Sequence, residues 1–308
     1  MASSQQNQSV CARLCGTDSH KCLHFWEAVA CELVATFLFV CLLLSSTISW
    51  DEKTPSVVQI ALCAGLAVAT LVHCFGDVSG GHINPAVTVA MLVTGKIGLL
   101  KALFYVIAQC VGAIAGAAFV RGVTPEGVRG TMGANILNPD ITQVQAFGVE
   151  FVLTFVLVFT VFATVDEKNA ISGSKPLAIG IAVVIAHLAG IGYTSLSINP
   201  ARTLGTAVIT GIFDDHWVFW AGPLAGGVSA GWLYVLPSGR RALMKSGQPN
   251  ESRGQEAADD KHAEKVGTNN GVAPSSPAMY NDNKVFIVDD EIHGEAPSIN
   301  MTSVTTGL

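Results

Sequence analysis

Two copies of a short polar motif interrupt a largely apolar chain of 308 residues: Asn84-Pro85-Ala86 and Asn199-Pro200-Ala201. An asparagine side chain accepts hydrogen bonds from the first free N–H groups of a helix, and a proline at the next position has no N–H to lose. Each motif therefore predicts a helix start. If the two positive helix ends met inside a membrane, they would repel cations and orient a neutral, hydrogen-bonding guest.

Two carboxylates, Glu32 and Glu150, lie inside apolar stretches, where charge is costly and usually functional. Two interpretations are open. In an ion-coupled carrier the carboxylates would exchange protons. In a static scaffold they would accept hydrogen bonds from a loop folded into the membrane, because the loop's backbone N–H groups need protein partners at that depth. We favour the second interpretation, in which both are loop-supporting carboxylates.

Arg202 and His187 are two further polar residues in apolar surroundings. Arg202 directly follows the second motif and provides a fixed positive charge with several N–H donors, which would exclude cations from an aqueous path. The alternative is a structural ion pair with Glu32 or Glu150. A lone histidine such as His187 is more often a satisfied core residue than a functional one, so the pattern alone leaves its role open.

Six apolar stretches are long enough to cross roughly 30 Å of hydrocarbon as helices. They lie near residues 25–48, 57–75, 98–120, 144–165, 176–194 and 217–236. Two shorter stretches begin at the Asn-Pro-Ala motifs, at 84–93 and 199–211, and as helices would reach only about half of the bilayer. Half-length helices at matching places in two halves of a chain point to a binding site or pore.

The two halves of the chain repeat one another. His82 to Thr88 reappears as Ser197 to Thr203, and Cys31 to Phe37 matches Val149 to Phe155. Three predicted spans separate the copies, so one copy must be inverted relative to the other. We therefore expect an all-α membrane fold with six transmembrane helices and two re-entrant half-helices, arranged as an inverted repeat.

Charge excludes some partners and sets an orientation. Only 13% of the residues are charged and the net charge is −6, so the chain has no basic stripe for nucleic acid. Lys and Arg in the short connections are more frequent on the side that carries both tails, which predicts cytoplasmic termini. The protein is expected to be a multi-pass membrane protein, with the plasma membrane as its expected location.

Three segments together resemble the aquaporin (major intrinsic protein) family, and within it the animal water-selective aquaporin-4-like branch. They are Phe25 to Val29, Gly80 to Thr88 and His216 to Trp220, and the resemblance covers roughly residues 24–236. It implies a homotetramer with a separate pore in each subunit and a passive water channel driven by osmotic gradients. It also implies that His187 narrows the outer constriction beside Arg202.

Two positions of the implied selectivity filter depart from the family. Ala64 stands where water channels of this type usually carry Phe, and Leu196 stands where a small residue or Cys is usual. Loss of the aromatic ring should widen the mouth, whereas Leu196 could refill some of that space if its side chain points into the lumen. The alternative function is therefore a widened channel that also passes glycerol or urea.

Other positions match the water branch rather than the glycerol branch. Thr203 stands where glycerol channels have Asp, and bulky aromatics at Phe219 and Trp220 leave less room for a polyol. Water is thus the first expected substrate.

The expected organisation has three parts. Residues 1–24 form a cytoplasmic tail, 25–237 the channel domain, with repeats at about 25–120 and 144–237, and 238–308 a cytoplasmic, mostly disordered tail. The terminal Thr306-Gly307-Leu308 resembles a ligand of a PDZ-domain protein.

Two other classes stay open: an ion-coupled carrier, and a membrane scaffold that uses the tail as a hook. The sequence shows no metal-ligand spacing, nucleophile constellation or phosphate-binding glycine loop. We therefore expect no enzyme activity, cofactor or metal.

Overall fold

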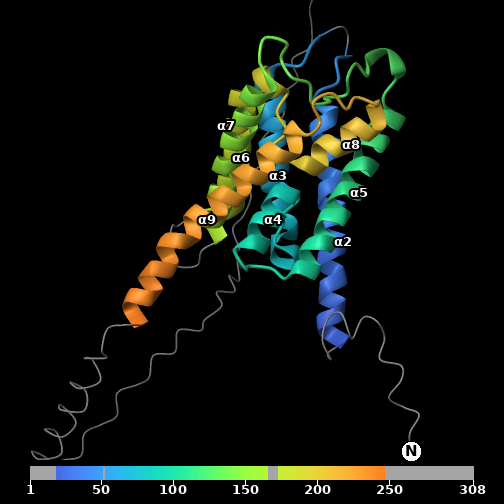
Figure 1. Ribbon diagram of the computed structural model, residues 1–308. Helices are drawn as coiled ribbons and strands as arrows, with labels where there is room; N and C mark the ends of the chain where they lie inside the picture. The colour runs from blue at the N-terminus through green and yellow to red at the C-terminus, as the bar shows by residue number, and fades with distance from the viewer. Residues whose placement is uncertain (1–18, 51–52, 166–172, 247–308) are drawn as a thin grey trace, which may run out of the picture. The chain divides into compact units, whose positions relative to one another are not determined.

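The computed structural model describes residues 19–50, 53–165 and 173–246, and these residues contain helices and no strand (Figure 1). One short 3-10 turn, η2 (Glu126–Val128), lies in the connection between the two repeats. The α-helices are α2 (Ser19–Ser45), α3 (Val57–Ser79), α4 (Pro85–Val93), α5 (Leu99–Val123), α6 (Gln143–Val165), α7 (Lys175–Thr194), α8 (Pro200–Thr210) and α9 (Val218–Ser246). The predicted all-α fold is confirmed.

Within the part of the chain that the structure describes, five helices are long and apolar enough to cross a membrane: α2 from Leu23 onward, α3, α5, α6 and α7. The sixth predicted span also forms a helix, α9, but its glycines and polar aromatics make it less apolar than the other five. The first and last helices are longer than predicted, since α2 begins at Ser19 and α9 continues to Ser246. Residues 247–308, with the C-terminal Thr306-Gly307-Leu308, lie outside the described part.

Local sequence explains where several helices begin and end. The Ser56 hydroxyl accepts a hydrogen bond from the third residue of α3, and Ser174 does the same for α7, as helix-capping residues do. Helix α3 ends at Gly80, whose φ of 94° is readily adopted only by a residue without a side chain. These caps fix the ends of the two helices that precede the Asn-Pro-Ala motifs.

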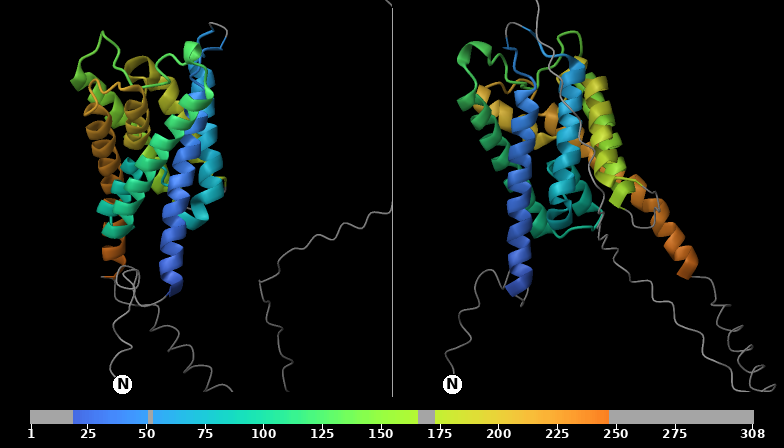
Figure 2. Two further views of the ribbon diagram at one scale, coloured as in Figure 1. Left: turned by 90° about the vertical axis from the view of Figure 1, so that its right-hand side faces the viewer. Right: turned by 180° about the vertical axis from the view of Figure 1, so that it is seen from behind.

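Contacts between helices follow a two-fold relation in which α2, α3, α4 and α5 correspond to α6, α7, α8 and α9. Helix α2 packs on α5 as α6 packs on α9, and α2 contacts α3 as α6 contacts α7. The half-helices cross between the repeats, because α4 packs on α9 and α8 packs on α5. The views in Figure 2 show α2 and α3 running side by side, and Figure 1 shows α4 and α8 in opposite halves of the bundle. This is the arrangement that an inverted repeat predicts.

Glycines bring the paired helices close together. A Cβ atom at Gly112 of α5 would lie 2.4 Å from the carbonyl oxygen of Leu33 in α2, and one at Gly226 of α9 would lie 2.2 Å from that of Phe151 in α6. Small residues allow such close approach between helices in lipid. The equivalent pairs therefore hold α2 to α5 and α6 to α9.

Candidate functional site

The two Asn-Pro-Ala motifs start the half-helices, as predicted. Asn84 is the capping residue of α4, and its Oδ1 accepts from the backbone N–H of Ala86 at 2.8 Å. Asn199 caps α8 in the same way, accepting from Ala201 at 3.1 Å. Pro85 and Pro200 are the first residues of the two half-helices, where a missing N–H costs nothing.

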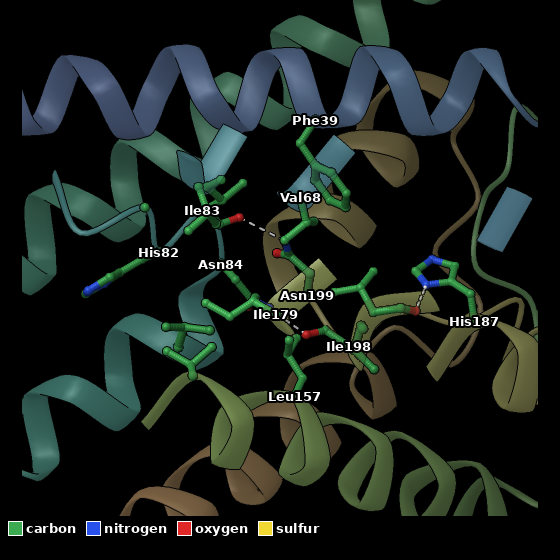
Figure 3. Close-up of a pocket in the computed structure, with 15 residues that line it drawn as sticks. Phe39, Val68, His82, Ile83, Asn84, Leu157, Ile179, His187, Ile198 and Asn199 are labelled. Atoms are coloured by element: carbon green, nitrogen blue, oxygen red, sulfur yellow. Dashed lines mark hydrogen bonds between the residues drawn. The ribbon is translucent and has the colours of Figure 1, made fainter. Parts of the chain in front are cut away.

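The amide groups of the two asparagines are bonded crosswise between the repeats. Nδ2 of Asn84 donates to the carbonyl of Ile198 at 2.7 Å, and Nδ2 of Asn199 donates to that of Ile83 at 2.9 Å (Figure 3). A primary amide has two N–H donors. One donor of each asparagine therefore fixes the side chain, while the second is available to a guest.

The two isoleucines that accept these bonds have unusual backbones. The φ angle is 56° at Ile83 and 45° at Ile198, a left-handed conformation that β-branched residues seldom adopt. Such a conformation costs on the order of 1–3 kcal/mol at each site and persists only where the surroundings enforce it. Its occurrence at the same place in both repeats indicates that the direction of these carbonyl groups matters.

Glu32 supports the loop between α3 and α4. Its buried carboxylate accepts from the backbone N–H groups of His82 at 2.9 Å and Ile83 at 2.7 Å. It also accepts from the Ser79 hydroxyl at 2.7 Å and the Gln109 amide at 2.8 Å. All these donors belong to the loop or to its support, so the contacts favour the scaffold interpretation.

Glu150 holds the loop between α7 and α8 in the corresponding way. Its fully buried carboxylate accepts from the backbone N–H groups of Ser197 at 2.9 Å and Ile198 at 2.8 Å, and from the Thr194 hydroxyl at 2.7 Å. The matching bonds of Glu32 and Glu150 again follow the two-fold relation.

A narrow cavity of about 40 Å³ is lined by the two asparagines. Figure 3 shows the asparagine pair midway along it, with His82 and His187 toward opposite ends. Its walls are mostly aliphatic, so polar groups are few and separated. The lining residues are Phe39, Val68, Val72, Gly81, His82, Ile83, Asn84, Val87, Leu157, Val161, Ile179, Val183, His187, Ile198 and Asn199.

His187 presents one ring nitrogen to this cavity. Its Nδ1 lies 2.9 Å from the carbonyl oxygen of Val183, which can only accept, so Nδ1 carries the hydrogen. The other nitrogen, Nε2, is buried without a protein partner. A neutral His187 therefore offers an acceptor to a molecule in the cavity.

Arg202 is buried and is held by Asn135 rather than by a carboxylate. Its Nη1 donates to Oδ1 of Asn135, which also accepts from the Thr203 hydroxyl at 2.7 Å. Neither Glu32 nor Glu150 forms an ion pair with Arg202 in the described part of the chain. Nε of Arg202 is buried without a partner.

Sequence reasoning missed Asn135 and Gln109. Asn135 lies in the irregular connection between the repeats, where no periodicity or motif marks it. Gln109 is a polar residue within an apolar span, a signal that could have been noticed. Its amide donates to both Glu32 and Thr88, at 2.8 and 2.9 Å.

Ala64 and Leu196 do not line the cavity. Ala64 is fully buried, and the neighbouring Gly65 packs against Val184, one turn before His187, which places Ala64 near the level of His187. Leu196 is also fully buried and packs against Gly190 of α7. The condition under which Leu196 would refill the lumen is therefore not met in this structure.

Comparisons with known proteins agree with this arrangement. Residues 19–234 match the family described as major intrinsic protein. Aquaporin-4 of Homo sapiens is 50% identical over 215 residues, covering 68% of this chain and 67% of that protein. Aquaporin-2 of Bos taurus is 48% identical over 235 residues, covering 73% of this chain and 87% of that protein.

A solved structure shows the same fold. The X-ray structure of the aquaglyceroporin from Plasmodium falciparum superposes with a TM-score of 0.62 at 23% identity, covering 69% of this chain and 98% of that one. The helix arrangement, the paired motifs and the relatives lead to one conclusion: this chain belongs to the major intrinsic protein family, the aquaporin family of membrane channels.

Proposed function

We propose that the protein is a passive water channel, driven by osmotic gradients, that excludes protons and ions. The observation that carries the proposal is the pair of crosswise-bonded amides, Asn84 and Asn199, each with a second N–H donor beside a narrow apolar cavity. Two aquaporins from mammals, aquaporin-4 and aquaporin-2, are about half identical to the chain, which supports the same assignment.

Water passes because the cavity replaces some of its bulk hydrogen bonds without holding it tightly. The Asn84 and Asn199 amides donate, and Nε2 of His187 accepts. Apolar walls offer nothing between these groups, so each water is released as readily as it is bound. A neutral molecule with both donors and acceptors suits this sequence of partners.

Cations and protons are excluded electrostatically. The positive ends of α4 and α8 meet at the asparagine pair, and each end carries about half an elementary charge. Arg202 adds a full charge, buried two residues after Pro200 at the start of α8 and held by Asn135. Together these charges raise the energy of a hydronium ion or metal cation in the cavity.

A second candidate function is a widened channel that also passes small neutral solutes such as glycerol or urea. Ala64 contributes only a methyl group at the level of His187, and Leu196 is packed against α7 instead of the lumen. Both placements favour a mouth wider than that of a strict water channel. The mouth is the end of the cavity that His187 lines.

Several further properties belong to the same proposal. The distribution of Lys and Arg supports cytoplasmic termini, and with them a mouth that faces the outer side of the membrane. The family supports a homotetramer with one pore in each subunit, and we propose the plasma membrane as the location. We also propose, independently of the channel function, that the C-terminus binds a PDZ-domain protein.

Stopped-flow light scattering of proteoliposomes tests the proposal. Osmotic water permeability well above that of protein-free vesicles, without saturation, is the expected result; saturable uptake coupled to an ion gradient would indicate a carrier. No osmotic permeability, with tail-dependent clustering, would indicate a scaffold.

Two variants address the mouth in the same assay. Arg202→Val should raise proton and cation leakage, and unchanged leakage would contradict the role given to Arg202. Ala64→Phe should abolish any glycerol permeability of the wild type while water continues to pass. Wild-type vesicles that pass water but no glycerol would eliminate the second candidate function.

A further inference from the structure

Gly190 lies on α7 one turn after His187 and contacts the side chain of Leu196. We propose that Gly190 determines the solute range of the channel, because it leaves a notch in α7 that holds Leu196 out of the lumen and keeps the mouth open to neutral solutes of the size of glycerol. This inference rests on the proposed channel function.

The notch has room for no side chain at position 190. A Cβ atom there would lie 2.4 Å from Cδ1 of Leu196 and 2.6 Å from Cδ1 of Leu153. Carbon atoms that are not bonded pack at about 3.5–4.0 Å. Even a single methyl group on residue 190 would therefore collide with both leucines.

The backbone around Leu196 cannot move easily to relieve such a collision. The Thr194 hydroxyl and the Ser197 N–H both donate to the same carboxylate oxygen of Glu150, at 2.7 and 2.9 Å. Leu196 is thus clamped from both sides, within a loop that also shapes the asparagine pair. A methyl group at position 190 must instead turn the Leu196 side chain.

The direction of that turn follows from what surrounds the notch. Leu153 of α6 already occupies one side of it, which closes the route toward α6. The route that remains leads along α7 toward His187, which lies one turn before Gly190 and lines the end of the cavity. A displaced Leu196 side chain therefore enters the mouth beside His187 and narrows it.

The experiment compares glycerol and water permeability of the purified full chain in proteoliposomes. The variants are Gly190→Ala, Leu196→Ala and the double variant, and Gly192→Ala is the matched control. Gly192 lies on the same helix, and a Cβ atom there would meet nothing within 4 Å. Size-exclusion chromatography confirms that each variant is folded before its flux is compared.

The expected result is a several-fold lower glycerol-to-water permeability ratio for Gly190→Ala, with the wild-type ratio in Gly192→Ala. The double variant should regain the wild-type ratio, because no leucine is left to enter the mouth. An unchanged ratio in Gly190→Ala, or a double variant that stays low, would overturn the proposal.

Two outcomes keep the inference separate from the channel function itself. Wild-type vesicles that pass water but no glycerol would overturn this inference and leave the water channel standing. Vesicles that pass neither would refute the channel. If Gly190→Ala does not fold, Leu196→Ala still tests the proposal. No rise in the glycerol-to-water permeability ratio is expected, because Leu196 lies outside the lumen. A several-fold rise would show that Leu196 already narrows the lumen and would overturn the proposal.

Discussion

Replacing Glu150 by leucine should destabilise the protein strongly, because its carboxylate is the acceptor for the loop that precedes α8. The substitution leaves the backbone N–H groups of Ser197 and Ile198 buried without a partner. Each such orphaned donor costs about 1–3 kcal/mol, so the expected loss is about 2–6 kcal/mol. The buried Thr194 hydroxyl loses the same acceptor.

Glu150→Gln should have a smaller effect. Glutamine keeps one carbonyl oxygen, which can accept from one of the two backbone N–H groups of Ser197 and Ile198. Its NH₂ group takes the place of the second carboxylate oxygen and cannot accept from the other N–H. One orphaned N–H then costs about 1–3 kcal/mol. Glu126→Gln is the matched control, since Glu126 is exposed in η2, and exposed substitutions stay within about 0.5 kcal/mol.

Thermal unfolding of the purified variants in detergent measures these differences. For a chain of this size, 1 kcal/mol corresponds to about 2–4 °C, so Glu150→Leu should unfold roughly 4 to 24 °C below the wild type. A leucine variant that unfolds at the wild-type temperature would refute the scaffold role. A glutamine variant of full stability that has lost transport would instead favour proton coupling.

Three further predictions concern residues around the cavity. Asn135→Ala should raise ion leakage through proteoliposomes, because Arg202 loses the acceptor that holds it; leakage at the wild-type level would contradict this. Arg121→Ala removes a 2.6 Å bond to the carboxyl end of α8 and should lower the free energy of unfolding by about 1 kcal/mol, seen as a small fall in unfolding temperature. Nε2 of His216 accepts a hydrogen bond from the Trp220 indole, which it can do only when the imidazole is neutral. Burial lowers the pKa of His216. The contribution of this neutral imidazole to stability is therefore complete above about pH 6.5 and is lost as the pH falls through the lowered pKa. His216→Gln should flatten this part of the profile of unfolding temperature against pH.

The helices and the motif geometry could be predicted because their signals are local. Apolar length marks the spans, and the Asn-Pro pair at Asn84 and Asn199 specifies a helix start whatever surrounds it. The inverted relation followed from counting spans between repeats. The support by Glu32 and Glu150 followed from the cost of leaving backbone groups unpaired in a membrane.

The placement of single side chains could not be predicted in the same way. Asn135 bonds to Arg202 across 67 residues of chain, and nothing near Asn135 in sequence announces that contact. The Leu196 side chain packs where a methyl group on residue 190 would lie, and no periodicity or motif in the sequence indicates that these two residues are in contact. Residues whose role is set by a distant neighbour are visible only once both are placed.

The crosswise bonds between Asn84 and Ile198, and between Asn199 and Ile83, also constrain how the protein can be made. Their partners lie 114 and 116 residues apart, so neither bond can form until the second repeat has been synthesised as far as Asn199 and inserted. An isolated first repeat would leave the Asn84 amide without that acceptor and the Ile83 carbonyl without its donor. The centre of the channel therefore cannot be completed by either half alone, because each half supplies one donor and one acceptor to it.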